Sequence, residues 1–171
     1  MTERGRKRLS FLRFGTRDAA PLAASVDAPA PGTVLPLADV PDPVFASGAV
    51  GPGFAVDITS GTIGAPVAGT VVLVADTLHA VGIRAANGAE VLVHVGIDSM
   101  KLRGEGFTAL CAAGDDVEAG QPILEVDLDV LRGRVPSTIT PVVVSNAAAF
   151  DLEGPALDAP DARGILVVRG R

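Results

Sequence analysis

The sequence predicts an all-β fold with one or two short helical turns. Of its 171 residues, 48% are hydrophobic, and they include 20 Gly and 13 Pro but neither Trp nor Tyr. Such a chain forms many short strands separated by turns, and Val, Ile and Leu fill its interior in place of aromatic rings. The length is sufficient for one domain of about 130–150 residues with a substantial core, and it leaves no room for a second domain.

Two similar segments predict a pseudo-repeat within this domain. Residues 28–34, Ala-Pro-Ala-Pro-Gly-Thr-Val, recur as residues 65–71, Ala-Pro-Val-Ala-Gly-Thr-Val. We expect Gly32 and Gly69 each to permit a turn that leads into a strand, because glycine adopts backbone conformations that other residues avoid. The fold should therefore contain two related β segments.

The other elements are predicted from short apolar runs bounded by turn residues. Residues 127–132 should begin a short helix with Asp127 as its cap and Gly133 near its end. A turn is expected at residues 113–116, between two strands. The runs of strand length are residues 42–45, 50–53, 54–58, 106–110, 121–127, 140–144 and 165–168.

The central stretch, residues 77–98, contains the only two histidines of the chain, His79 and His94. Within it, Asn87-Gly88 stands between two runs rich in Val, Ile and Leu. This pattern predicts an antiparallel hairpin with a two-residue turn, since Asn-Gly readily adopts the positive φ angles that such a turn requires. The strands would close at Ala86 and Ala89.

In that register both imidazoles lie on one face of the hairpin. His94 faces Val81, and Gly96 faces His79, so His79, Val81 and His94 point to the same side. Diagonal neighbours of this kind lie about 7–8 Å apart at the backbone, which allows two rings to converge on one small group. A three-residue turn would break this parity.

Charge is distributed unevenly along the chain. Residues 1–18 contain six Lys or Arg and two Asp or Glu, a balance of +4, and the rest of the chain carries −10 of the total of −6. An acidic body excludes nucleic acid as a partner. Residues 1–24 should form a basic tail and an Ala/Pro-rich linker, either disordered or lying on an anionic membrane surface, and residues 25–171 the domain.

The cysteine count and the absence of long apolar segments suggest the compartment. The single cysteine, Cys111, excludes an internal disulfide and a thiolate zinc cluster. The sequence has neither the apolar core of a signal peptide nor a run of about 20 apolar residues. We therefore expect a cytoplasmic protein, which the basic tail can hold at the inner face of the membrane.

Two chemistries suit a pair of converging histidines. In a zinc hydrolase, both would bind the metal with a carboxylate from Asp98 or Glu90, but the sequence lacks the His-x-His and His-Glu-x-x-His spacings of such sites. In phosphoryl transfer, a neutral imidazole attacks phosphorus through one nitrogen while a carbonyl holds its other N–H. The second imidazole donates a hydrogen bond to the phosphoryl oxygens. Phosphoryl transfer needs two histidines and little else, so we prefer it.

Six segments carry a resemblance to a known family. They are residues 42–46 (Asp-Pro-Val-Phe-Ala), 65–70 (Ala-Pro-Val-Ala-Gly-Thr), 77–80 (Thr-Leu-His-Ala), 93–98 (Val-His-Val-Gly-Ile-Asp), 101–107 (Lys-Leu-Arg-Gly-Glu-Gly-Phe) and 137–146 (Ser-Thr-Ile-Thr-Pro-Val-Val-Val-Ser-Asn). With them the chain resembles the glucose-class enzyme IIA component of the bacterial phosphoenolpyruvate-dependent sugar phosphotransferase system. The resemblance spans residues 25–171 and implies an antiparallel β-sandwich.

The resemblance also implies roles for individual residues. His94 would accept the phosphoryl group as a tele-phosphohistidine, His79 would stabilise that group, and Thr77 would hydrogen-bond to the site histidine. The donor would be the phosphocarrier protein HPr, and the acceptor would be the cysteine of a IIB domain in a sugar permease. Such a protein is a phosphotransferase of sugar uptake that requires no cofactor.

The sequence departs from the family at its expected docking surface. Family members often have Phe where this chain has Val81, Leu92 and Val95. These three residues and Asp98 are expected to bind partners. The alternative function is a regulatory binding protein controlled by phosphorylation, with a zinc ion at His79 and His94 bridging to a target protein. The transported sugar is chosen by the membrane component and is not predicted by this sequence.

Overall fold

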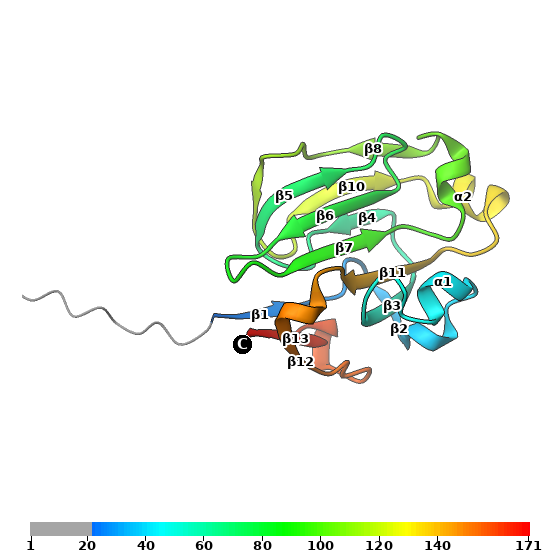
Figure 1. The fold of residues 1–171 in the computed structure, drawn as a ribbon. Coiled ribbons are helices and arrows are strands. Elements are labelled where there is room, and N and C mark those ends of the chain that lie inside the picture. The colour runs from blue at the N-terminus through cyan, green and yellow to red at the C-terminus, as the bar shows by residue number, and fades with distance from the viewer. Residues whose placement is uncertain (1–21) are drawn as a thin grey trace, which may run out of the picture.

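Three antiparallel sheets make up the fold in the computed structural model, which describes residues 22–171 (Figure 1). One sheet has seven strands in the order β2-β3-β11-β7-β6-β5-β9, and the two three-stranded sheets have the orders β4-β10-β8 and β1-β13-β12. The strands are β1 (Ala23–Val26), β2 (Gly32–Pro36), β3 (Gly53–Ile58), β4 (Thr62–Gly64), β5 (Gly69–Val74), β6 (Ala80–Arg84), β7 (Glu90–His94), β8 (Phe107–Ala109), β9 (Asp116–Val117), β10 (Pro122–Val126), β11 (Ile139–Val144), β12 (Phe150–Glu153) and β13 (Leu166–Gly170).

The helices are short, as predicted. They are α1 (Pro43–Ala46), α2 (Leu128–Arg134) and the 3₁₀ turns η1 (Leu37–Asp39), η2 (Ser99–Leu102), η3 (Ala147–Ala149) and η4 (Pro160–Ala162). The predicted cap of α2 is present, because the Asp127 carboxylate accepts hydrogen bonds from the backbone N–H groups of Asp129 and Val130. Within residues 22–171, none of the helices is both long and apolar enough to span a membrane.

The core lies between the β5–β6–β7 part of the large sheet and the β4–β10–β8 sheet. Val81 and Ile83 of β6 belong to the same buried cluster as Ile63 of β4 and Ile123 and Leu124 of β10. Aliphatic side chains from two sheets thus pack face to face, and an antiparallel sandwich results. The predicted all-β fold is confirmed.

The repeated segments lead into β2 and β5, where their glycines allow close approach of two backbones. A Cβ atom added to Gly32 would lie 2.1 Å from the carbonyl oxygen of Asp57, and one added to Gly69 would lie 2.1 Å from that of Arg84. Any side chain at either position would collide with the paired strand. Each Gly-Thr therefore begins a strand against a neighbouring backbone, in addition to following a turn.

Two predicted strands are absent. Residues 42–45 were expected to be extended, but Pro43–Ala46 forms α1, because Asp42 accepts hydrogen bonds from Val44 N at 2.8 Å and Phe45 N at 3.4 Å. Asp as N-cap followed by Pro at the first helical position favours a helix start over a strand. Residues 50–52 form a loop, and the extended chain begins with β3 at Gly53.

The histidine hairpin forms where predicted, but its register differs by one residue. Ala80 faces His94 and Arg84 faces Glu90. The turn contains three residues between Ala85 and Ala89, and Gly88 has a φ angle of +89°. This geometry is that of a three-residue loop with a left-handed glycine as its last residue. The predicted two-residue turn, and with it the pairing of His94 with Val81, is wrong.

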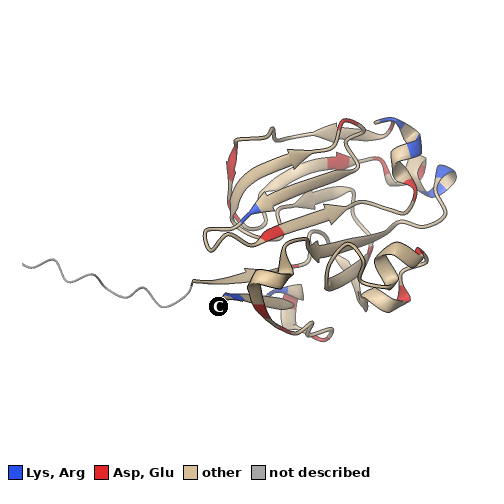
Figure 2. Cartoon of the chain, in the orientation of Figure 1, with Lys and Arg blue, Asp and Glu red and all other residues tan. Residues whose placement is uncertain are grey.

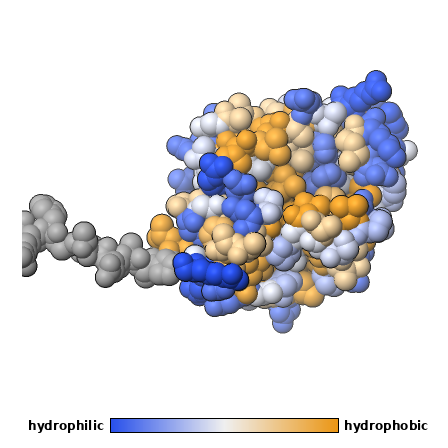
Figure 3. All heavy atoms as spheres, in the orientation of Figure 1, coloured by the Kyte–Doolittle hydropathy of each residue, from blue (hydrophilic) through white to orange (hydrophobic). Residues whose placement is uncertain are grey.

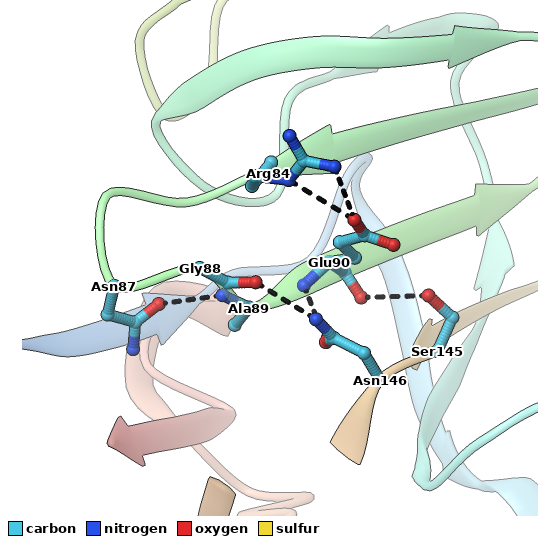
Figure 4. Close-up of polar contacts among 7 residues, drawn as sticks. All are labelled: Arg84, Asn87, Gly88, Ala89, Glu90, Ser145 and Asn146. Atoms are coloured by element: carbon cyan, nitrogen blue, oxygen red, sulfur yellow. Dashed lines mark hydrogen bonds and ion pairs between the residues drawn. The ribbon is translucent and has the colours of Figure 1, made fainter. Parts of the chain in front are cut away.

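Hydrogen bonds from the side chains of Asn87, within the turn, and Asn146, outside the hairpin, hold this longer turn (Figure 4). The Asn146 side chain accepts a hydrogen bond from Glu90 N at 2.8 Å and donates one to the Gly88 carbonyl at 2.9 Å. The Asn87 side chain accepts from Ala89 N at 3.1 Å and donates to the carbonyls of Leu22 and Val168. The loop length is therefore determined by tertiary hydrogen bonds that a local pattern does not include.

The N-terminal boundary of the domain stays a prediction, since the basic tail of residues 1–18 lies outside the described residues. Within them, β1 pairs with β13 from Ala23 onward. The first described strand thus begins two residues before the predicted start of the domain at residue 25.

Candidate functional site

His94 is the last residue of β7 and is 7% exposed. Its Nδ1 lies 2.9 Å from the carbonyl oxygen of Gly96. Because a carbonyl only accepts hydrogen bonds, Nδ1 carries the proton and donates it, and Nε2 is left with a lone pair. Gly96 has a φ angle of +74°, which glycine adopts without strain, so the chain can bend back towards its own histidine.

His79 immediately precedes β6, and its ring lies against that of His94. The ring centroids are 4.7 Å apart and the planes meet at 77°. The Oγ1 atom of Thr77 lies 2.6 Å from His79 Nδ1. All three site residues that the resemblance implied are therefore within one small region.

The two rings converge for a different reason from the one predicted. In the observed register His79 would face Val95, and strict alternation along the strand would send His79 and His94 to opposite faces. However, β6 begins only at Ala80, and Leu78 has a left-handed φ angle of +59°. The regular pleat does not extend to His79, so its side chain can turn towards His94.

A third ring completes the site. Phe45, on α1, has its ring centroid 4.9 Å from that of His94, with the planes tilted by 59°. The N-cap of α1, Asp42, fixes the helical turn that carries Phe45. Packing on one side and the Gly96 hydrogen bond on the other restrict rotation of the His94 ring. Reasoning from the sequence missed the contact of Phe45 with His94, although Asp42-Pro43 is a recognisable helix start.

Both histidines are neutral near pH 7. Burial, and then the neighbouring His94, lower the pKa of His79 from 6.5 to about 4. Burial also lowers the pKa of His94, while the hydrogen bond to Gly96 and the charges of Asp42 and Asp98 oppose that shift. Neutral imidazoles retain the lone pair that a nucleophile or a metal ligand needs.

The Nε2 atom of His94 reaches the solvent. Among residues 22–171, no hydrogen bond involves Nε2 of either histidine, and no buried side-chain nitrogen or oxygen lacks a partner. Because every buried polar side-chain atom in this part of the chain has a partner and His94 Nε2 has none, this nitrogen is not buried. It lies at the surface, although most of the His94 ring is covered. The site thus offers one accessible nitrogen with a lone pair beside a second imidazole.

The predicted partner-binding residues are only partly at the surface. Val81 and Val95 are fully buried at 0% exposure because their side chains belong to the apolar core between the sheets, so neither lies at a surface that a partner could bind. Leu92 is half-buried and packs against a second cluster that contains Phe45 and Val143. Asp98 is partly exposed, and its charge acts on His94.

Glu90, one of the two carboxylates predicted to bind zinc with the histidines, does not lie near them. That residue lies at the other end of β7, where its carboxylate forms a 2.7 Å ion pair with Arg84. In the described part of the chain, no three His, Cys, Asp or Glu residues form a group that could hold a metal ion. His79 and His94 therefore supply two possible metal ligands, and no third ligand from the described residues joins them.

An antiparallel β-sandwich with two neutral, converging imidazoles, one with an accessible nitrogen, has the features that a phosphohistidine carrier needs. Residues 24–150 match the family model of the phosphoenolpyruvate-dependent sugar phosphotransferase system, EIIA 1. The chain belongs to this family, whose members are phosphotransferases that form phosphohistidine. The family, the fold and the type of chemistry predicted from the sequence are thus confirmed.

Relatives and a solved structure agree with this assignment. The chain is 45% identical over 128 residues to the glucose-specific EIIA component of Halalkalibacterium halodurans, covering 75% of this chain and 74% of that protein. It is 44% identical over 155 residues to the mannose-specific EIIBCA component of Corynebacterium glutamicum, covering 90% of this chain but only 23% of that longer protein. Glucose permease IIA from Mycoplasma capricolum superposes with a TM-score of 0.71 at 37% identity, covering 73% of this chain and 81% of that one.

Proposed function

We propose that His94 Nε2 accepts a phosphoryl group from phospho-HPr and passes it to the cysteine of a IIB domain during sugar uptake. One observation carries this assignment. The Nδ1–H of His94 is held by the Gly96 carbonyl, and the opposite nitrogen, Nε2, is accessible to solvent. A neutral imidazole held in this way is a nucleophile at Nε2.

Neither transfer requires His94 to gain or lose a proton. In the first, the Nε2 lone pair forms a bond to phosphorus while the donor's own P–N bond breaks. In the second, the IIB thiolate forms an S–P bond, the bond from Nε2 to phosphorus breaks, and Nε2 recovers its lone pair. The proton stays on Nδ1 in both transfers and remains hydrogen-bonded to the Gly96 carbonyl, so the ring keeps its orientation.

His79 stabilises the phosphoryl group, and Thr77 sets the tautomer of His79. When the Thr77 hydroxyl donates to Nδ1, Nε2 of His79 carries the hydrogen and can donate it to a phosphoryl oxygen. The ring centroids are 4.7 Å apart, so this donor lies next to the group on His94. A donor already in place stabilises the charge that shifts as the P–N bond breaks.

The remaining assignments follow from this role. A carrier that meets HPr and a permease works in the cytoplasm. The basic tail of residues 1–18 can hold it at the inner face of the membrane, with residues 25–171 as the carrier domain. Asp98 and Leu92 belong to the surface that partners approach.

Zinc binding shared with a regulatory target is the second candidate for the same pair. Two neutral imidazoles in contact can each donate a lone pair to one zinc ion, and a partner's carboxylate would supply a further ligand. Zinc-dependent capture of a partner that disappears when His94 is phosphorylated would support it.

The main test identifies the phosphorylated atom. Phospho-HPr should label the protein at one acid-labile site, and ³¹P NMR should show the chemical shift of an Nε2-phosphohistidine. His94→Ala removes the attacking nitrogen and should abolish the label. Normal labelling of that variant, or phosphorus on Nδ1, would contradict the assignment.

A further inference from the structure

The η2 turn has an exposed side and a buried side. Lys101 and Arg103 are exposed at a corner rich in basic residues (Figure 2), and Figure 3 shows hydrophilic side chains over this corner. Ser99, the first residue of η2, is instead 0% exposed. Burial of a hydroxyl costs free energy unless the group is hydrogen-bonded, so the bond that Ser99 makes is informative.

The Ser99 hydroxyl closes the turn that follows His94. Its Oγ donates a hydrogen bond to the carbonyl oxygen of Val95 at 2.5 Å, and both residues are fully buried. Among residues 22–171, no backbone N–H donates to that carbonyl. Ser99 is therefore the donor that satisfies the Val95 carbonyl, in an interior where an unsatisfied carbonyl is costly.

Gly96 joins two peptide planes that are hydrogen-bonded separately. The plane before it contains the Val95 carbonyl, which accepts from Ser99. The plane after it contains the Gly96 carbonyl, which accepts from His94 Nδ1 at 2.9 Å, and the next N–H, which donates to the Ser137 carbonyl at 2.9 Å. Because glycine rotates easily between the two planes, each plane needs a hydrogen bond of its own to stay in place.

The backbone of this turn adopts conformations that need support. Gly96 has a φ angle of +74°, and Asp98 has one of +55°, a left-handed conformation that few residues other than glycine adopt. Such a conformation persists where surrounding contacts determine it. The hydrogen bond from Ser99 to Val95 spans both residues. Ser99 also packs against the glycine, since a Cβ atom added to Gly96 would lie 3.6 Å from the Cβ of Ser99.

We propose that Ser99 is a positioning residue, whose hydroxyl fixes the turn so that the Gly96 carbonyl holds the Nδ1 proton of His94. The inference rests on the proposed function and adds a residue that acts through the backbone. When the carbonyl moves away, the proton of a neutral imidazole can occupy either nitrogen. The tautomer protonated on Nε2 has the same charge but no lone pair there to attack phosphorus. Ser99 thus preserves the reactive tautomer.

The test reads the tautomer and the reaction separately. In ¹⁵N NMR of the full, unphosphorylated chain at about pH 8, where a histidine is neutral, wild-type His94 should carry its proton on Nδ1. Ser99→Ala should show a mixture of both tautomers. Its rate of labelling by phospho-HPr should fall by about three- to tenfold, the range expected for one neutral hydrogen bond, with the final stoichiometry unchanged.

Thr140→Val is the matched control. Thr140 is also 0% exposed, and its hydroxyl donates to the Thr138 carbonyl at 3.1 Å, a bond outside the turn that follows His94. This variant likewise removes one buried hydroxyl, but it should leave the His94 tautomer and the labelling rate unchanged. Ser99→Thr keeps the hydroxyl and should restore both. Ser99→Cys, with a weaker donor of similar size, should give an intermediate effect and serves if the larger side chain does not fold.

Two results would overturn the proposal. One is a tautomer as pure as that of the wild type, or a wild-type labelling rate, in Ser99→Ala. The other is an equal change in Thr140→Val, since loss of any buried hydroxyl would then suffice. Failure of the proposed function looks different, because phospho-HPr would not label even the wild-type chain, whereas the NMR signals of His94 report on Ser99 without any donor of phosphate.

Discussion

The two ends of the β6–β7 hairpin differ in how their polar groups are used. At the turn end, Asn146 bonds to both Gly88 and Glu90, and Asn87 bonds to three further backbone groups. At the open end, His79 and His94 each use Nδ1 in one hydrogen bond, and neither Nε2 has a partner among the described residues. The polar groups at the turn end are thus hydrogen-bonded within the protein, whereas the Nε2 atoms at the open end can bind a ligand.

This difference shows how one hairpin can be both rigid and reactive. The hydrogen bonds at the turn hold the strands in a single register, which determines that His94 faces Ala80. The open end then needs only short-range contacts, from Thr77, Gly96 and Phe45, to orient the two rings. Changes at the turn should therefore affect stability, and changes at the open end should affect transfer.

The largest expected effect is at the open end. His79→Gln should still accept phosphate on His94 but should transfer it to the IIB domain about 10²–10³ times more slowly, the usual cost of losing one transition-state donor. Gln can hydrogen-bond to the phosphoryl group at rest but cannot replace the imidazole as the P–N bond breaks. Single-turnover transfer from the phosphorylated variant measures this. A wild-type transfer rate would show that the second imidazole is unnecessary.

The next effect tests the turn end. Asn146→Ala leaves Glu90 N and the Gly88 carbonyl without their partner and should lower the free energy of unfolding by about 1–3 kcal/mol. Ser145→Ala is the matched control, since its hydroxyl contacts the Glu90 carbonyl only at 3.4 Å and should matter little. Chemical denaturation gives both values. Loss of phosphoryl transfer in folded Asn146→Ala would contradict the separation of the two ends.

A third prediction concerns pH. The pKa of His79 is about 4 in the folded protein and 6.5 in an unfolded chain, so the unfolded state binds more protons between these values. Stability should therefore be fully present above about pH 6.5 and should decrease as the pH falls towards 4. His79→Gln should show a shallower decrease than the wild type, and identical pH profiles would mean that His79 is not held neutral.

The smallest effect is expected at the exposed ion pair near the turn. The Arg84–Glu90 pair spans 2.7 Å, but the side chains are 55% and 34% exposed. Glu90→Gln should therefore cost no more than about 1 kcal/mol, with the loss shrinking in high salt. A cost equal to that of Asn146→Ala would mean that the ion pair, and not the amide network, holds the turn.

Local patterns in the sequence determined the type of fold and the chemistry. Short Val- and Ile-rich runs predicted β10, β11 and β13, Asp127 predicted the start of α2, and Asn87-Gly88 predicted the hairpin. Two histidines flanking that turn suggested phosphoryl transfer, and the motifs around them indicated the family. These predictions succeeded because strand periodicity, helix caps and turn glycines act within a few residues.

Only the tertiary structure decided how the histidines meet and which residues face a partner. The register was mispredicted because Asn146, distant in sequence, supports a three-residue turn, and the rings still converge because Leu78 leaves the strand conformation. Val81 and Val95 are buried because they belong to the core between the sheets, and which face of a hairpin meets another sheet cannot be read from alternation along a single strand. Register, burial and the contact of Phe45 with His94 depend on long-range packing, so they lie beyond local sequence patterns.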